Sequence, residues 1–70
     1  MEASDYFLRG YEYLLDENYS QANEAFWKAQ EMIFGHDKIA MLREETKDFD
    51  PDVVALSSNE LLRHALGLTE

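Results

Sequence analysis

A chain of 70 residues without a single cysteine has few ways to hold a stable fold. Domains of this size bury a modest fraction of their surface, and most of them add a disulfide, a metal or a partner chain. The missing cysteines exclude disulfides and thiolate zinc sites. They also fit a reducing compartment, which favours a cytoplasmic location. A partner chain is therefore the additional source of stability that we expect.

The charge of the chain restricts the partners that it can have. Its 15 acidic and 6 basic residues give a net charge of −9. Phosphate backbones and anionic lipids repel such a protein, so we expect neither a nucleic acid nor a membrane as its partner. No apolar stretch is long enough to span a bilayer, and the acidic residues 1–5 do not resemble the start of a signal peptide. A basic protein partner fits the charge better.

Apolar residues recur at helical spacing, and no alternating β-branched run competes with them, so we predict an all-α fold. The first expected helix covers residues 4–16, with Ser4 or Asp5 as its cap. One side of this helix carries Phe7, Tyr11, Leu14 and Leu15, and a second side carries Tyr6, Gly10 and Tyr13. Because both sides are apolar, we expect the helix to be buried on two sides.

The second expected helix covers residues 20–34. It follows a turn in which Asn18 can adopt a left-handed conformation at low cost, and Ser20 is the expected cap. Its apolar stripe consists of Ala22, Ala25, Phe26, Ala29 and Ile33. The alanines of this stripe allow a close approach of another helix, whereas Trp27 and Phe34 lie off the stripe. Gly35 favours a break at the end of this helix over its continuation.

The remaining residues predict an acidic connecting helix over 37–48 and a C-terminal helix over 50–67. Asp50 and Pro51 are suited to the cap and the first position of the C-terminal helix, and Gly67 to its end. Residues 57–59 can interrupt it, so the segment is one helix or two short ones. The expected inward residues are Ile39 and Leu42 in the connecting helix and Val54, Leu61, Leu62, Ala65 and Leu66 in the last. We thus expect a single domain, residues 1–70, built as a three- or four-helix bundle.

The first half of the chain, residues 3–36, resembles a tetratricopeptide repeat, a helix-turn-helix unit of about 34 residues. The resemblance rests on the order and spacing of Gly10, Tyr13, Tyr19, Ala22, Phe26 and Ala29. It implies an antiparallel hairpin in which Gly10 and Ala22 lie where the two helices cross. Tyr13 and Tyr19 then fill the space near the turn.

The chain departs from the repeat pattern at two positions. Arg9 stands where the pattern usually has Leu, and Phe34 stands near the place of its Pro. No second copy follows Gly35. An alternative resemblance is to the HEPN-like group of small prokaryotic helical proteins, whose second helix is similar to residues 19–29. The ribonucleases of that group use an Arg and a His several residues apart, whereas Arg63 and His64 are adjacent and diverge by about 100° on a helix.

A single repeat cannot bury its own apolar face, so either the C-terminal helix or a second copy of the chain must cover it. The candidate partner-binding residues are Phe7, Tyr11, Trp27 and Phe34. For Trp27 two interpretations stay open: an interface hot spot, or packing under the third or fourth helix. The expected groove positions lack the Lys and Asn residues with which repeats of this family bind a C-terminal carboxylate, so we do not expect that ligand.

The polar residues form no pattern that predicts catalysis or metal binding. His64 follows Glu60 by four residues, a spacing more typical of a solvated pair than of a metal site. Asp48, Asp50 and Asp52 alternate as in a calcium loop, but the sixth position holds Val53 in place of Gly. We therefore predict no enzyme, no cofactor and no bound metal.

Two functional hypotheses follow from the sequence. The first is a non-catalytic adaptor that binds a protein partner through an apolar and aromatic helical surface. The alternative is a self-assembling structural subunit, a homo-oligomer with no separate ligand.

Overall fold

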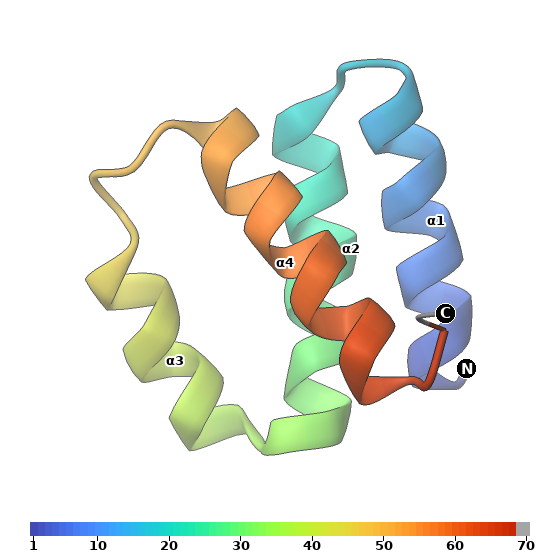
Figure 1. Cartoon of the computed structure of the whole chain (residues 1–70). Coiled ribbons are helices and arrows are strands. Elements are labelled where there is room, and N and C mark those ends of the chain that lie inside the picture. Colours follow the sequence, from blue (N-terminus) through green and yellow to red (C-terminus); the bar gives the residue numbers. More distant parts are fainter. Residues whose placement is uncertain (69–70) are drawn as a thin grey trace.

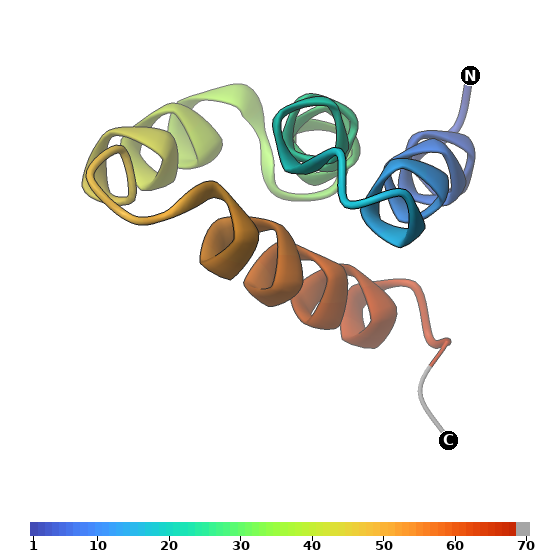
Figure 2. The same ribbon diagram turned by 90° about the horizontal axis from the view of Figure 1, so that it is seen from above.

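The chain folds into four helices, α1 (Ala3–Leu15), α2 (Tyr19–Phe34), α3 (His36–Glu45) and α4 (Pro51–Ala65), in a computed structural model that describes residues 1–68. No strand occurs within these residues, so the predicted all-α fold is confirmed. Thr69 and Glu70, the end of the predicted single domain, lie outside the described residues. Figure 1 shows α1 and α2 side by side and antiparallel. Seen from above, α1, α2 and α3 form one layer, and α4 lies across its underside (Figure 2).

Helix α2 lies at the centre of this arrangement, because it contacts each of the three other helices. One of its sides carries Ala22, Phe26 and Ala29, which are all fully buried. They pack in one cluster with Phe7 of α1 and with Ala55 and Leu62 of α4. The predicted stripe of α2 is therefore confirmed as the main core of the protein.

A second side of α2 is buried by the helices that follow it. Trp27 forms a smaller cluster with Ile39 of α3 and Val54 of α4, and Leu42 packs against this cluster. The two predicted inward residues of the connecting helix thus contribute to a core, although α3 is otherwise polar. Among the described helices, α3 contacts α2 but not α4.

Gly10 sets how closely α1 approaches α2. A Cβ atom added to Gly10 would lie 2.5 Å from two ring carbons of Phe26. Only a residue without a side chain fits in this space, because Phe26 is itself fully buried. The contact that requires a small residue at position 10 is therefore made with Phe26.

The starts of α1 and α2 differ from those predicted. Helix α1 begins before Ser4, and the Asp5 carboxylate accepts a hydrogen bond of 2.9 Å from the backbone N–H of Glu2. Helix α2 begins at Tyr19, where Asn18 rather than Ser20 is the cap and accepts from the backbone N–H of Gln21 at 3.5 Å. The left-handed residue of the turn is Glu17, with φ of 60°, and not Asn18.

The ends of the helices agree better with the sequence. Gly35 has φ of 97° and separates α2 from α3, so the predicted break is confirmed. Pro51 is the first residue of α4 and Asp50 its cap residue, although the Asp50 side chain forms no capping hydrogen bond. Helix α4 is continuous through residues 57–59. Gly67, with φ of 71°, follows its end.

The outward residues of α1 and α4 correct the predicted core. On α4, Leu61 and Ala65 are exposed, and Ala55 and Ser58 are buried in their place. The face of α4 that meets α2 is centred on the small residue Ala55, which permits closer packing than a leucine would. On α1, Leu15 and Tyr13 are exposed, because only one side of this helix has neighbours.

We expect Gly10→Ala to destabilise the fold. On an exposed helix position Ala is about 1 kcal/mol more favourable than Gly, but here the methyl group overlaps the Phe26 ring. The free energy of unfolding, measured by urea denaturation, should fall by about 1–3 kcal/mol. Arg9→Ala, at an exposed position of the same helix, is the control and should change it by less than about 0.5 kcal/mol. A Gly10→Ala protein as stable as the wild type would contradict the close contact.

Candidate functional site

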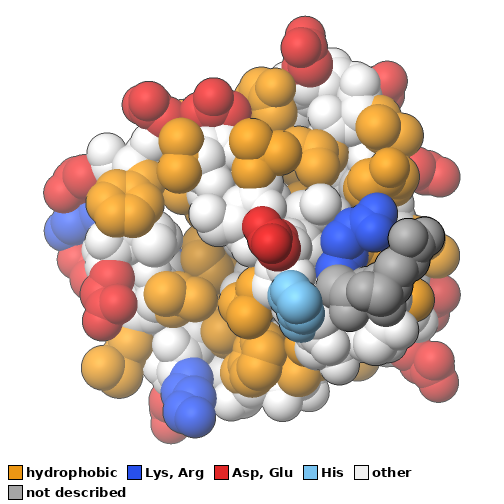
Figure 3. Space-filling view, in the orientation of Figure 1, with side chains coloured by type: hydrophobic (Ala, Val, Ile, Leu, Met, Phe, Trp, Pro, Cys, Tyr) orange, Lys and Arg blue, Asp and Glu red, His pale blue; other side chains and the backbone are white. Residues whose placement is uncertain are grey.

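A groove lined mainly by apolar residues lies between α3 and α4. Its deeper part is a hollow of about 220 Å³ over Trp27 and Gln30 of α2. A wider hollow of about 430 Å³ adjoins it at Leu42 and Leu61, which line both. Figure 3 shows apolar side chains gathered over this region. We define the α3–α4 groove by the residues that line the two hollows: Trp27, Gln30, Phe34, Lys38, Ile39, Met41, Leu42, Glu45, Thr46, Phe49, Val53, Val54, Ser57, Ser58 and Leu61.

The groove exists because the backbones of α3 and α4 do not pack against each other. Residues 46–50 span the distance between the two helices (Figure 1). Each helix contacts α2, so α2 closes the space between them on one side, which we call the bottom of the groove. The opposite side is open to solvent. Large apolar side chains on both edges are left exposed, including Met41 at 66%, Phe49 at 58% and Leu61 at 40%.

The bottom of the groove is built around Trp27, which is only 7% exposed. Ile39 and Val54 pack against it. The guanidinium of Arg43 lies 5.6 Å from the centre of a Trp27 ring, a cation–π distance. The indole is thereby held between three helices.

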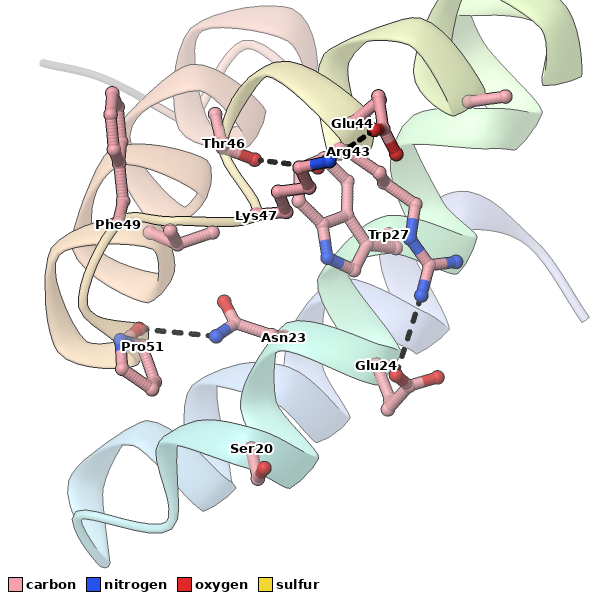
Figure 4. Close-up of a pocket in the computed structure, with 12 residues that line it drawn as sticks. Ser20, Asn23, Glu24, Trp27, Arg43, Glu44, Thr46, Lys47, Phe49 and Pro51 are labelled. Carbon is pink, nitrogen blue, oxygen red and sulfur yellow. Dashed lines mark hydrogen bonds and ion pairs between the residues drawn. The ribbon is translucent and has the colours of Figure 1, made fainter.

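A second, more polar hollow of about 580 Å³ adjoins the groove and shares Trp27, Thr46, Phe49 and Val54 with it (Figure 4). Its cationic groups are engaged with neighbouring acids. Arg43 lies 3.5 Å from a carboxylate oxygen of Glu24, and Lys47 lies 2.6 Å from one of Glu44. These pairs are exposed, so they shape the surface more than they stabilise it.

Asn23 joins the start of α4 to α2. Its side-chain N–H donates a hydrogen bond of 3.1 Å to the backbone oxygen of Pro51, as Figure 4 shows. The bond links residues 28 positions apart in the chain. It therefore helps to set the position of α4, and with it one edge of the groove.

Gln30 is a fully buried polar residue at the bottom of the groove. Its side-chain N–H donates to the backbone oxygen of Phe26 at 3.3 Å, whereas its Oε1 atom has no hydrogen-bond partner. A buried acceptor without a partner costs stability, by about 1–3 kcal/mol. Gln30 is thus a buried polar residue with an unsatisfied acceptor beneath a groove lined mainly by apolar side chains.

The structure places the four candidate partner-binding residues apart. Phe7 and Trp27 are buried in the two different clusters, so they belong to the core in this fold and not to a free surface. Tyr11 is half-buried, stacked on Phe7 at 6.3 Å and lying under Arg63 at 5.8 Å. Phe34 is 36% exposed and lines the groove. Of the four candidates, it is the one that is both exposed and part of the groove.

The residues assigned to hairpin packing are mostly inside. Ala22, Phe26 and Ala29 are fully buried, Gly10 is buried against Phe26, and Tyr19 packs partly against the main core. Tyr13 is the exception, because it is largely exposed.

Sequence reasoning missed the exposed groove residues Met41, Phe49 and Val53, and it placed Leu61 in the core. Phe49 offered a signal, since it is a large apolar residue between two aspartates in a connecting segment. The others could not be recognised, because their exposure depends on the distance between α3 and α4.

The ionisable residues of the sequence analysis are on the surface. His36 lies 3.7 Å from Glu31 and is 78% exposed at its side chain, and His64 is exposed on α4. Within residues 1–68, no three metal-ligating side chains come together. None of the helices described is long and apolar enough to cross a membrane.

Comparison with known proteins found no matching family model, no matching curated protein and no matching solved structure. The resemblance to a tetratricopeptide repeat therefore stays a prediction. The functional interpretation rests on the geometry of the α3–α4 groove.

We expect Trp27→Ala to destabilise the whole fold, because the indole lies between α2, α3 and α4. Truncation of a large buried aromatic residue costs about 3–5 kcal/mol, measurable as a lower melting temperature and urea midpoint. Met41→Ala, which removes an exposed side chain from α3, is the control and should be nearly neutral. A small effect of Trp27→Ala would mean that the indole is not part of a packed cluster.

We expect Gln30→Met to raise stability. The substitution keeps the length of the side chain and removes the acceptor that has no partner. The gain should be about 1 kcal/mol in the free energy of unfolding, by urea denaturation. Gln21→Met, at an exposed position of the same helix, is the matched control and should be nearly neutral. A loss of stability in Gln30→Met alone would show that the amide is satisfied.

Proposed function

We propose that this protein is a non-catalytic binding module that holds a protein partner in the α3–α4 groove. The observation that carries the proposal is the concentration of exposed large apolar side chains there. Phe34, Met41, Phe49, Val53 and Leu61 come from α2, α3, the connecting residues and α4 and line one continuous groove. Contiguous apolar surface of this kind is typical of interaction sites in small soluble domains.

The build of the groove supports binding without large rearrangement. Its bottom is formed by buried residues of α2, and its edges are helices that pack on α2. A preformed apolar site loses little conformational entropy when a ligand enters, so more of the contact energy is available for affinity.

The rival is the self-assembling subunit, in which the same groove is covered by a second copy of the chain. Each copy has a net charge of −9, so the long-range electrostatic term opposes association of two copies. A separate partner with lower negative charge meets no such opposition.

The proposal predicts that polar substitutions in the groove abolish partner capture. The double variant Met41→Ser, Leu61→Ser removes two exposed apolar side chains of the groove without changing the charge. The control, Leu8→Ser, Leu15→Ser, makes the same kind of change on exposed positions of α1. Tagged proteins are used as baits in a lysate of the source organism, and retained proteins are identified by mass spectrometry.

We expect at least one protein to be retained by the wild type and the α1 control and lost with the groove variant. Equal retention by all three baits would contradict the groove as the binding site. Sedimentation velocity at two concentrations tests the rival. A wild-type oligomer that the groove variant converts to a monomer would favour self-assembly instead.

A further inference from the structure

We propose that the occupant of the α3–α4 groove is an amphipathic helix of the partner, with large apolar residues along one side and Lys or Arg on both flanks. This inference rests on the proposed function and deepens it by naming the chemistry of the ligand.

The layer arrangement of the fold favours a helix as the occupant. Three helices form the upper layer, whereas α4 is the single helix of the lower layer, and the space beside it under α3 has no covering element (Figure 2). A helix placed there would pack against α3 and lie beside α4. A peptide that binds by strand addition would need a strand edge to pair with, and residues 1–68 contain no strand.

The apolar positions of the groove also match a helix. Met41 on α3 and Val53 and Leu61 on α4 are exposed along the edges of the groove, and Phe49 lies at one end. A ligand helix presents its apolar residues at spacings of three and four, which form one narrow stripe. Such a stripe can contact both edges at once, as in other helix-in-groove complexes.

The charge around the groove selects a basic ligand. Residues 37–60 contain seven acidic and three basic residues. Of these three, Arg43 and Lys47 lie beside Glu24 and Glu44, and Lys38 lines the groove next to Glu45 in the wider hollow. Six exposed acids of this segment have no ion-pair partner among the described residues: Asp37, Glu45, Asp48, Asp50, Asp52 and Glu60. Of these, Glu45 lines the groove itself. Acidic side chains are visible at the edges of the apolar region in Figure 3.

The same charges argue against a second copy of this chain as the occupant. A symmetric contact through the groove would bring the unpaired acids of one copy, Glu45 among them, closer to those of the other. Like charges at an interface are costly, whereas Lys and Arg on the flanks of a ligand helix would be attracted by them. A basic amphipathic helix satisfies both the apolar and the charged part of the site.

Three designed peptides of equal length test the proposal on the full-length protein. The first has Leu at helical spacings of three and four with Lys at the flanking positions, and the second replaces each Lys by Glu. The third keeps the Lys composition but scrambles the positions of the Leu residues. Binding is followed by the fluorescence of Trp27, the single tryptophan of the chain, which lines the groove, and by calorimetry.

We expect the first peptide to bind and the other two to bind at least about tenfold more weakly. The affinity should fall as salt is raised, because exposed charges more than about 10 Å apart are screened at 0.1 M ionic strength. The variant Glu45→Gln, Asp52→Asn should weaken binding about two- to fivefold for each carboxylate removed. The matched control, Glu12→Gln, Glu17→Gln, makes the same change in net charge on exposed positions at the α1 end of the molecule and should leave the affinity unchanged.

The groove variant Met41→Ser, Leu61→Ser separates docking from mere charge attraction and should abolish binding of the first peptide. Equal binding of the Lys and Glu peptides would overturn the basic ligand. Binding of the Lys peptide that the groove variant leaves intact would overturn the site. If no peptide binds while a lysate protein is still captured through the groove, the amphipathic basic helix is wrong and the proposed function stands. If the groove instead closes a dimer, the occupant is a second copy and this inference fails.

Discussion

The whole structure depends on α2 being buried on two sides at once. Its first side combines Phe26 with two fully buried alanines, and Gly10 of α1 leaves room for the Phe26 ring. This close approach of α1 and α2 forms the surface on which α4 lies. Its second side places Trp27 where α3 and α4 must both cover it. A single central helix thus organises a chain too short to build a separate core for each helix pair.

The groove is a consequence of this arrangement, in which α3 and α4 each pack on α2 and not on each other. Helix α3 covers one edge of Trp27 through Ile39, but no backbone contact joins α3 to α4. It therefore packs on α2 alone, and the apolar residues that face α4 stay exposed. In a larger domain another helix would fill this space. Here the same space, bordered by acids, becomes the feature that supports a binding function.

The chain segments that form helices could be predicted, since helical spacing, Gly35 and Pro51 act within a few residues of their own position. The stripe of α2 could be predicted for the same reason. The cap residues could not be predicted, because the side chains of Ser4, Asp5, Asn18 and Ser20 can all cap a helix. The structure has Glu2 and Asn18 at these positions. Two groove residues, Trp27 and Phe34, were among the predicted partner-binding residues, and of these two Phe34 is exposed.

The sequence by itself determined the all-α class, the position of the helices, the break at Gly35 and the acidic character of the surface, because these follow from local periodicity, backbone preference and composition. The tertiary structure alone decided which apolar residues are core and which are surface. The sequence allows either role for Trp27 and predicts Leu61 in the core, yet Trp27 is buried and Leu61 is exposed on an open groove. The difference arises from the spacing between α3 and α4, which depends on how each packs on α2 and is not encoded in the periodicity of either helix.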